Sequence, residues 1–405
     1  MKILRSILKS TPFKILLLVF VTLVFLELLS TAAVYFILDI KNNNYAHLYE
    51  NDPKLKTITW TENYTPHPYF GYESPKLIKS EKILSNVGDN DFVIGILGGS
   101  VAAMFGEYSR RHLSHFEPLR EVIPTFGDKN LQIVNLALGG AKQPQQFFIS
   151  VYYMDKLDLI INIDGYNDAV SSHLLPFYPL EFPNLSTKFY RRTKQGGFFV
   201  SIGRMARWVY KEITFAPKAI PGLSRSSLYF VFWYNIREFL YRVVRACESA
   251  YYDNEFKAHQ TKALRDIPEK EFIQKRIDIW KKYTILEDDV IRKRTDKPIF
   301  FFLQPNQYLK NSKPFSEQEK LTAVDSAHIE STNMRMVLLK TAVQDLRRTG
   351  VPIFDLTGIF SDTKDTIYKD TCCHINNLGN RIMADVIVSD IMLYQTSGAT
   401  QTHHQ

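Results

Sequence analysis

Cysteine is scarce in this sequence of 405 residues, which contains only Cys247, Cys372 and Cys373. In an oxidising compartment Cys247 can bridge to one of the adjacent pair and leave one thiol over, or all three can be packing cysteines. Neighbouring cysteines rarely bond to each other without strain. A zinc site built from the pair and His374 is not expected either, because adjacent residues point apart and the sequence offers no second ligand pair. We therefore expect neither a metal nor a cofactor.

The sequence also lacks a stripe of basic residues interleaved with aromatics, although its net charge is +8 and its pI is about 9.1. The lysines and arginines are spread along the chain, so we expect no nucleic-acid partner. A chain that lies over an anionic membrane surface explains the basic balance as well. With 45% hydrophobic and 23% charged residues, the composition is that of an ordinary globular protein with a large core.

The long hydrophobic run from Ile15 to Leu38 contains one charged residue, Glu27. It can cross roughly 30 Å of hydrocarbon as a helix, and the basic residues before it place the N-terminus in the cytoplasm. We expect residues 1–40 to be a retained membrane anchor and the rest of the chain to be extracytoplasmic, in the periplasm or at the cell surface. A cleaved signal peptide is the alternative, because the small residues at 30–33 suit a cleavage site. The apolar residues that continue beyond them favour the anchor.

The stretch from Phe92 to Ala102 places a serine at the end of a buried strand. An apolar run of strand length ends in Gly98 and Gly99, so the chain should turn tightly and expose the Ser100 hydroxyl. A helix that starts after the serine would direct N–H groups and the positive end of its dipole at an oxyanion. The stretch fits neither the dinucleotide fingerprint nor the phosphate loop, and it departs from the Gly-x-Ser-x-Gly elbow at Ala102.

Four further apolar runs have strand length and are separated mostly by helical stretches, at 131–137, 157–163, 298–303 and 351–356. This order predicts an α/β fold of three layers, in which helices cover both faces of a mostly parallel sheet. Ligands of such sheets bind outside the carboxyl ends of the strands. We therefore predict a catalytic domain in two parts, residues 91–170 and 298–394, with a loose tail at 395–405.

The segments around this domain have less regular patterns. Residues 41–90 are polar and contain several prolines with no helical period, which predicts an extended stalk and wrapping segment. Its aromatic cluster from Pro66 to Tyr72 should pack against the catalytic lobe. Residues 171–297 predict a mostly helical insertion, a candidate lid. A basic patch in it could touch anionic glycan or lipid, although a solvated loop is the better default. The patch comprises Lys188, Arg191, Arg192 and Lys194.

The order of motifs resembles the SGNH hydrolases, also called GDSL-type esterases and lipases. Ser100, after two glycines, matches the nucleophile block, which more usually reads Gly-Asp-Ser, and His374 matches the base. Gly140 matches the glycine whose backbone N–H donates to the oxyanion, and Asn167 matches the asparagine whose amide is a further donor. The resemblance spans about residues 91–393. It implies a flavodoxin-like α/β/α fold and a serine nucleophile that needs no metal or cofactor.

One departure from the family concerns the acidic residue. It usually stands three positions before the histidine, where this sequence has Thr371, and Asp370 is one residue further away. An extra residue could bulge out and let Asp370 hold the imidazole, or a backbone carbonyl could replace the carboxylate. We assign the orienting role to Asp370, and Asp355, Asp362 and Asp365 remain candidates.

Together these residues predict serine chemistry, because a serine hydroxyl needs an imidazole to take its proton and the resulting oxyanion needs fixed donors. The expected catalytic residues are Ser100, His374 and Asp370, with an oxyanion hole of Ser100, Gly140 and Asn167. The predicted function is an extracytoplasmic serine esterase or acyl-transfer enzyme acting on ester-linked acyl groups of cell-surface glycans or lipids. The alternative is a non-catalytic SGNH-like envelope protein that binds glycan or a partner. The sequence identifies no protein partner.

Overall fold

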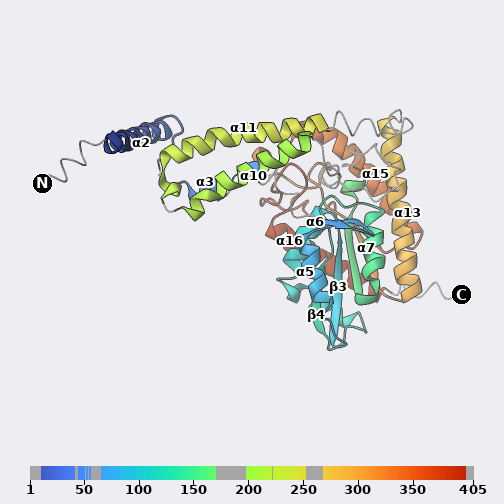
Figure 1. Ribbon diagram of the computed structural model, residues 1–405. Helices are drawn as coiled ribbons and strands as arrows, with labels where there is room; N and C mark the ends of the chain where they lie inside the picture. The colour runs from blue at the N-terminus through green and yellow to red at the C-terminus, as the bar shows by residue number, and fades with distance from the viewer. Residues whose placement is uncertain are drawn as a thin grey trace. The chain divides into compact units, whose positions relative to one another are not determined.

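The computed structural model describes residues 11–41, 44–50, 52, 54–55, 65–169, 198–220, 222–251 and 268–397. The chain forms two compact units (Figure 1). Unit 1 comprises Met1–Asn63 and Lys194–Ala258, and unit 2 comprises Tyr64–Thr193 and His259–Gln405. The basic patch predicted at 188–194 lies outside the described residues.

A parallel sheet of five strands forms the core of unit 2 (Figure 1). They pair in the order β4-β3-β5-β6-β7, and every pair is parallel. From β3 the chain first adds β4 on one side and then crosses back to add β5 on the other side of β3. The carboxyl ends of β3 and β5 therefore flank the switch point, where doubly wound sheets bind ligands. The predicted α/β fold with a parallel sheet is confirmed. The strands are β3 (Asp91–Gly98), β4 (Asn130–Asn135), β5 (Leu159–Asp164), β6 (Ile299–Leu303) and β7 (Ile353–Asp355).

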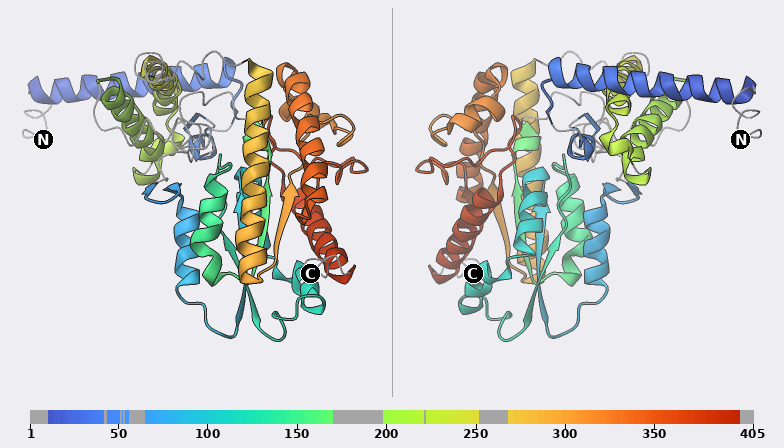
Figure 2. Two further views of the ribbon diagram at one scale, coloured as in Figure 1. Left: turned by 90° about the vertical axis from the view of Figure 1, so that its right-hand side faces the viewer. Right: turned by 90° about the vertical axis from the view of Figure 1, so that its left-hand side faces the viewer.

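Helices cover both faces of this sheet (Figure 2). On one face α6 (Ser100–Ser109) packs against α16 (Asn377–Thr396). On the other face α13 (Glu269–Thr295) lies between α7 (Gln145–Tyr153) and α15 (Ile329–Arg348). Every residue of β5 and β6 is buried, as expected for strands that are covered on both sides.

The predicted insertion at 171–297 is divided between the two units. Helix α13 belongs to unit 2 and contacts β6, because its apolar stripe, which includes Ile277 and Trp280, is buried in the core of that unit. Helices α10 (Phe198–Ala219) and α11 (Ser227–Tyr251) belong to unit 1.

Residues 65–84 also differ from the predicted extended stalk. Strands β1 (Thr65–His67) and β2 (Gly71–Glu73) form an antiparallel hairpin, and α5 (Pro75–Leu84) follows it. Ser74 caps α5, and the helix buries Ser80, whose hydroxyl bonds to the backbone of Asn135. The helix was not predicted because a polar residue, Ser80, occupies a buried position between Leu77 and Leu84 and interrupts the apolar pattern. The predicted packing of the aromatic cluster is confirmed, because Phe70 and Tyr72 are buried in the core of unit 2.

The described part of unit 1 is helical. Helix α2 (Thr11–Phe36) is long and apolar enough to cross a membrane. Its Glu27 carboxylate accepts hydrogen bonds from the backbone N–H groups of Ser227 and Leu228 and from the hydroxyl of Ser226, at 2.5–3.1 Å. These N–H groups belong to the first turn of α11, where a helix lacks internal partners for its donors. Glu27 therefore caps α11 from a neighbouring helix.

In unit 2, Glu319 organises the loop between β7 and α16. Ser316 and Glu319 form a capping box at the start of α14 (Glu317–Thr322), in which the two residues are bonded reciprocally. The same carboxylate accepts the backbone N–H groups of Ile367 and Tyr368 at 2.8 and 2.9 Å and pairs with Lys313 at 2.8 Å. Burial raises the pKa of Glu319, but these donors more than offset it and leave the pKa below its usual value.

The Glu319→Gln substitution should destabilise unit 2, because Lys313 would keep a buried charge without its partner. Breaking a buried ion pair costs about 3–5 kcal/mol, whereas Glu317→Gln, which removes an exposed pair with Lys320, should cost less than about 1 kcal/mol. The wild-type protein should lose this stabilisation only as the pH falls through the lowered pKa of Glu319. Urea unfolding of both variants measures the difference, and equal losses would refute the role of Glu319.

Candidate active site

Ser100 is the first residue of α6 and follows directly on the turn that ends β3. Glycine is required at position 98, because its φ is +130° and a Cβ there would lie 2.0 Å from the carbonyl oxygen of Ile163. At this turn the backbone that ends β3 lies directly against the backbone of β5. It leaves the half-buried Ser100 at the N-terminus of a ten-residue helix, where the first N–H groups lack internal partners and the dipole is positive.

His374 connects Ser100 to Asp370. Its Nε2 lies 2.7 Å from Ser100 Oγ, and its Nδ1 lies 2.6 Å from Asp370 Oδ2. Burial lowers the pKa of His374, but the Asp370 carboxylate and the neighbouring Cys372 together more than offset it and raise the pKa above its usual value. Burial raises the pKa of Asp370, and the imidazole with the loop N–H groups brings it below its usual value. The three predicted side chains thus form one continuous series of hydrogen bonds.

The extra residue between Asp370 and His374 is accommodated by a turn around the Asp370 carboxylate. Its Oδ1 accepts the backbone N–H groups of Cys372 at 3.0 Å and Cys373 at 3.3 Å, while its Oδ2 faces the ring. The carboxylate therefore orders the loop and orients the imidazole at once. Among the described candidate aspartates, Asp370 is the one whose carboxylate contacts the ring.

Asn167 and Gly140 lie in loops that border the same turn. Asn167 is on α8 (Tyr166–Ala169), after β5, and its Nδ2 donates to the carbonyl oxygen of Ala141 at 2.9 Å. A Cβ at Gly99 would lie 2.3 Å from that Nδ2 and 3.7 Å from the Ala141 oxygen. The Asn167 amide and the loop after β4, in which Gly140 precedes Ala141, therefore both flank the residue before Ser100. The structure therefore brings Asn167 and the loop that contains Gly140 to the turn that precedes Ser100.

A buried ion pair, which the sequence analysis missed, lies behind these loops. Asp168 Oδ1 accepts the backbone N–H of Gln143 at 2.9 Å. Arg276 on α13 donates to the carbonyl oxygen of Gln143 at 3.0 Å and to Asp168 Oδ1 at 3.3 Å. The side chains of Asp168 and Arg276 are 0% and 1% exposed. Since Gln143 follows the Gly140 loop and Asp168 follows Asn167, the pair fixes the two loops to each other.

Burial shifts the pKa values of the charged groups in this layer. It raises the pKa of Asp168 to about 6, against the lowering effect of Arg276. Burial and the neighbouring Arg276 lower the pKa of Lys142 to about 7. Burial also raises the pKa of Glu287, whose carboxylate accepts from Gln143 Nε2, to about 7. A charged residue inside the apolar stripe of α13, Arg276, is the sequence signal that could have revealed the network.

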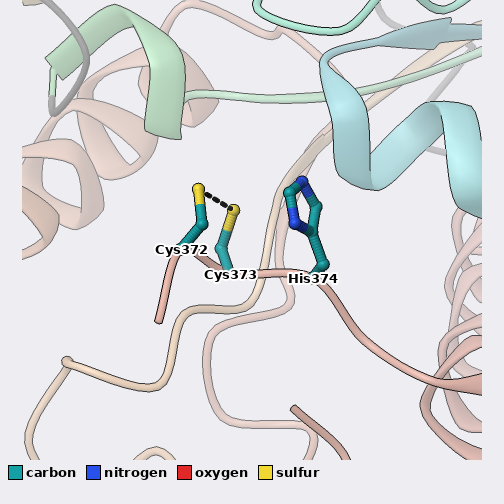
Figure 3. Close-up of side chains that lie close together, drawn as sticks. All are labelled: Cys372, Cys373 and His374. Atoms are coloured by element: carbon teal, nitrogen blue, oxygen red, sulfur yellow. Dashed lines mark hydrogen bonds between the residues drawn. The ribbon is translucent and has the colours of Figure 1, made fainter. Parts of the chain in front are cut away.

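Cys372 and Cys373 lie beside the base (Figure 3). Their sulfur atoms are 3.6 Å apart, and both lie within 4.8 Å of a ring nitrogen of His374. The expectation that adjacent side chains point apart is wrong, because the turn around Asp370 brings both sulfurs to the same side. Both residues are free thiols in the structure. A hydrogen bond with Cys373 lowers the pKa of Cys372 to about 7 and raises that of Cys373.

A second group of potential metal ligands lies on the β1–β2 hairpin and α5. His67, Glu73 and Glu81 bring one ligand atom each within 4.8 Å of one another. A backbone N–H lies 3.3 Å from His67 Nδ1, and the Tyr153 hydroxyl donates to Glu81 at 2.5 Å. The His67 ring stacks on Phe70 with 3.5 Å between centroids, as expected for a packed residue. These contacts account for the positions of His67 and Glu81.

Comparison with known proteins assigns no family to this chain. No protein-family model matches the chain, and no curated protein matches it. The chemical description therefore rests on the hydrogen bonds of Ser100, His374 and Asp370 and on the loops around them.

The Arg276→Met substitution should leave Asp168 buried without its charged partner. Breaking a buried ion pair in this way lowers the free energy of unfolding by about 3–5 kcal/mol. The matched control is Lys275→Met on the same helix, because Lys275 pairs with Glu271 at the surface and its loss should cost less than about 1 kcal/mol. Chemical denaturation of the full chain measures both. Similar losses of unfolding free energy in the two variants would contradict the proposal that the Asp168–Arg276 pair holds the two loops together.

Proposed function

We propose that the chain is a membrane-anchored serine hydrolase or acyl-transfer enzyme of the SGNH type. The observation that carries the proposal is the continuous hydrogen bonding from Asp370 through His374 to Ser100 at the start of α6. A nucleophile, a base in contact with it and a carboxylate that orients the base are the groups that serine-dependent acyl transfer requires.

In the proposed reaction Ser100 Oγ attacks an ester carbonyl while His374 Nε2 takes the hydroxyl proton. Asp370 holds the opposite ring nitrogen and stabilises the imidazolium that forms. His374 then returns the proton to the departing alcohol, and the acyl group remains on Ser100. Water or a second alcohol, deprotonated by the same ring, then attacks the acyl carbonyl. The bond between the acyl group and Ser100 Oγ breaks, and His374 returns the proton to Ser100. This sequence requires no metal and no cofactor.

The proposed oxyanion hole consists of the backbone N–H groups of Ser100 and Gly140 and the amide of Asn167. Such donors act best when they are fixed before the reaction, in a site with little water. The buried pair of Asp168 and Arg276 supports this arrangement, because it ties the loop of Gly140 to the turn of Asn167.

Two observations support the SGNH assignment within this proposal. The strand order β4-β3-β5-β6-β7 is one of the doubly wound orders, and four separated sequence blocks meet at its switch point. The unusual Gly99 has a local explanation, because Asn167 Nδ2 occupies the space where a side chain at that position would begin.

The apolar helix α2 supports a location at a membrane, and we propose that the catalytic unit faces the extracytoplasmic side. An anchored site meets substrates at or near the membrane surface, which favours ester-linked acyl groups of cell-surface glycans or lipids. Both hydrolysis and acyl transfer use the same residues. The irregular spacing at Asp370 and the large insertion favour the alternative, a non-catalytic binding protein. The contact between Asp370 and His374 counters the first of these two reasons.

Reaction of the full-length protein with a fluorophosphonate probe tests the serine mechanism. We expect labelling at Ser100, none in Ser100→Ala, and a rate on the order of 100-fold to 10,000-fold lower in His374→Ala, since the base is lost. Mass spectrometry of the labelled peptide locates the adduct. A folded wild-type protein that stays unlabelled would favour the non-catalytic alternative, and labelling that is unchanged in His374→Ala would refute the role of the base.

The Gly99→Asp substitution restores the family's more usual nucleophile block but should impair this protein. Its Cβ would displace the Asn167 amide, and the loss of one oxyanion donor lowers turnover on the order of 100-fold to 1,000-fold. Gly358→Asp is the matched control, because a Cβ at that position meets nothing within 4 Å. Hydrolysis of nitrophenyl acetate, corrected for Ser100→Ala, measures the effect. Full activity of Gly99→Asp would disprove the placement of Asn167.

A further inference from the structure

Three potential ligand atoms converge at His374, the residue that contacts Ser100. The sulfur atoms of Cys372 and Cys373 are 3.6 Å apart, and a ring nitrogen of His374 lies within 4.8 Å of both (Figure 3). Cys373 is buried, whereas Cys372 is half-buried. The turn around Asp370 holds this arrangement, because its carboxylate accepts the N–H groups of both cysteines.

These distances are close to those of a tetrahedral site for a thiophilic cation. Two thiolates bound to zinc at 2.3 Å lie about 3.8 Å apart, and a thiolate and an imidazole nitrogen lie about 3.6 Å apart. The two sulfurs of Cys372 and Cys373 already have the required separation. The ring nitrogen of His374 lies within 4.8 Å of both sulfurs, so each nitrogen–sulfur distance needs to shorten by about 1.2 Å at most. Thiolate and imidazole donors select zinc and other soft cations over magnesium or calcium.

We propose that Cys372, Cys373 and His374 form a binding site for a thiophilic divalent cation of the zinc class, and that its occupation switches off Ser100. Both ring nitrogens of His374 are already engaged, Nε2 with Ser100 and Nδ1 with Asp370. A cation that binds either nitrogen therefore separates the base from its nucleophile or from its orienting carboxylate. Binding releases the thiol protons to solvent. The inhibition rests on the proposed serine mechanism, whereas the binding does not.

Titration of the reduced full-length protein with Cd²⁺ tests the binding without reference to activity. We expect an ultraviolet charge-transfer band from thiolate to cadmium that saturates at one ion per chain, and we expect Zn²⁺ to displace it. Cys372→Ser and Cys373→Ser should each weaken binding at least about tenfold, because even the loss of a group that only supports a ligand costs about 10-fold to 100-fold in metal affinity. Cys247→Ser is the matched control and should bind as the wild type does. A wild type without the band, or a band that persists in both Cys372→Ser and Cys373→Ser, would overturn the site.

The rate of fluorophosphonate labelling tests the inhibition. Saturating Zn²⁺ should slow labelling of Ser100 at least about tenfold, and a chelator should restore the rate, since the base is needed for nucleophilic attack. Cys372→Ser, compared with its own rate without zinc, should need at least about tenfold more Zn²⁺ than the wild type for the same slowing. A cadmium band in a protein whose labelling ignores zinc would refute the inhibition. A cadmium band in a protein that never labels would support the site and count against the serine mechanism.

Discussion

The hydrogen bond between Ser100 and His374 is the contact on which the site depends, and it joins residues 274 positions apart in the chain. Each end is held separately. The glycine turn after β3 fixes Ser100, and the Asp370 carboxylate fixes the imidazole and its loop. The helices that adjoin the two ends, α6 and α16, pack against each other on the same face of the sheet. Secondary structure thus brings the serine and the histidine within reach, and short polar contacts complete the alignment.

The second feature of the site is the amount of buried charge behind it. Asp168, Arg276, Lys142 and Glu287 are all almost fully inaccessible to water. Burial of ionisable groups is unfavourable unless they are paired or hydrogen-bonded, so a layer of this kind contributes little to stability by itself. Its physical effect is to position a loop. Asp168 and Arg276 bond to the backbone of Gln143 and so fix the loop that contains Gly140. Rigid loops suit a site whose donors must be in place before charge develops.

Much of this arrangement could be predicted from the sequence, because strand patterns and polar turns depend on residues that are close together in the chain. Runs of apolar residues predicted the sheet, and the positions of Ser100, Gly140, Asn167 and His374 at strand or loop ends predicted which groups would meet. The sequence did not reveal α5, since Ser80 interrupts its apolar stripe with a hydroxyl that bonds to β4. Nor did it reveal the Arg276 pair or the convergence of the two cysteines. The convergence of the cysteines depends on the folding of one loop around the Asp370 carboxylate, for which linear spacing carries no signal. The buried pair had a sequence signal in Arg276, a charged residue inside the apolar stripe of α13, but the spacing did not indicate its partner Asp168.

The cap that Glu27 provides for α11 bears on the fate of the N-terminal helix. A leader that is cut off by a peptidase contributes nothing to the finished protein. Here, removal of the chain up to the small residues at 30–33 would take away the carboxylate and leave the first N–H groups of α11 without it. The hydrophobic helix is therefore a structural component of unit 1 as well as an apolar segment long enough for a bilayer, and proteolytic maturation at that position would damage the unit it releases.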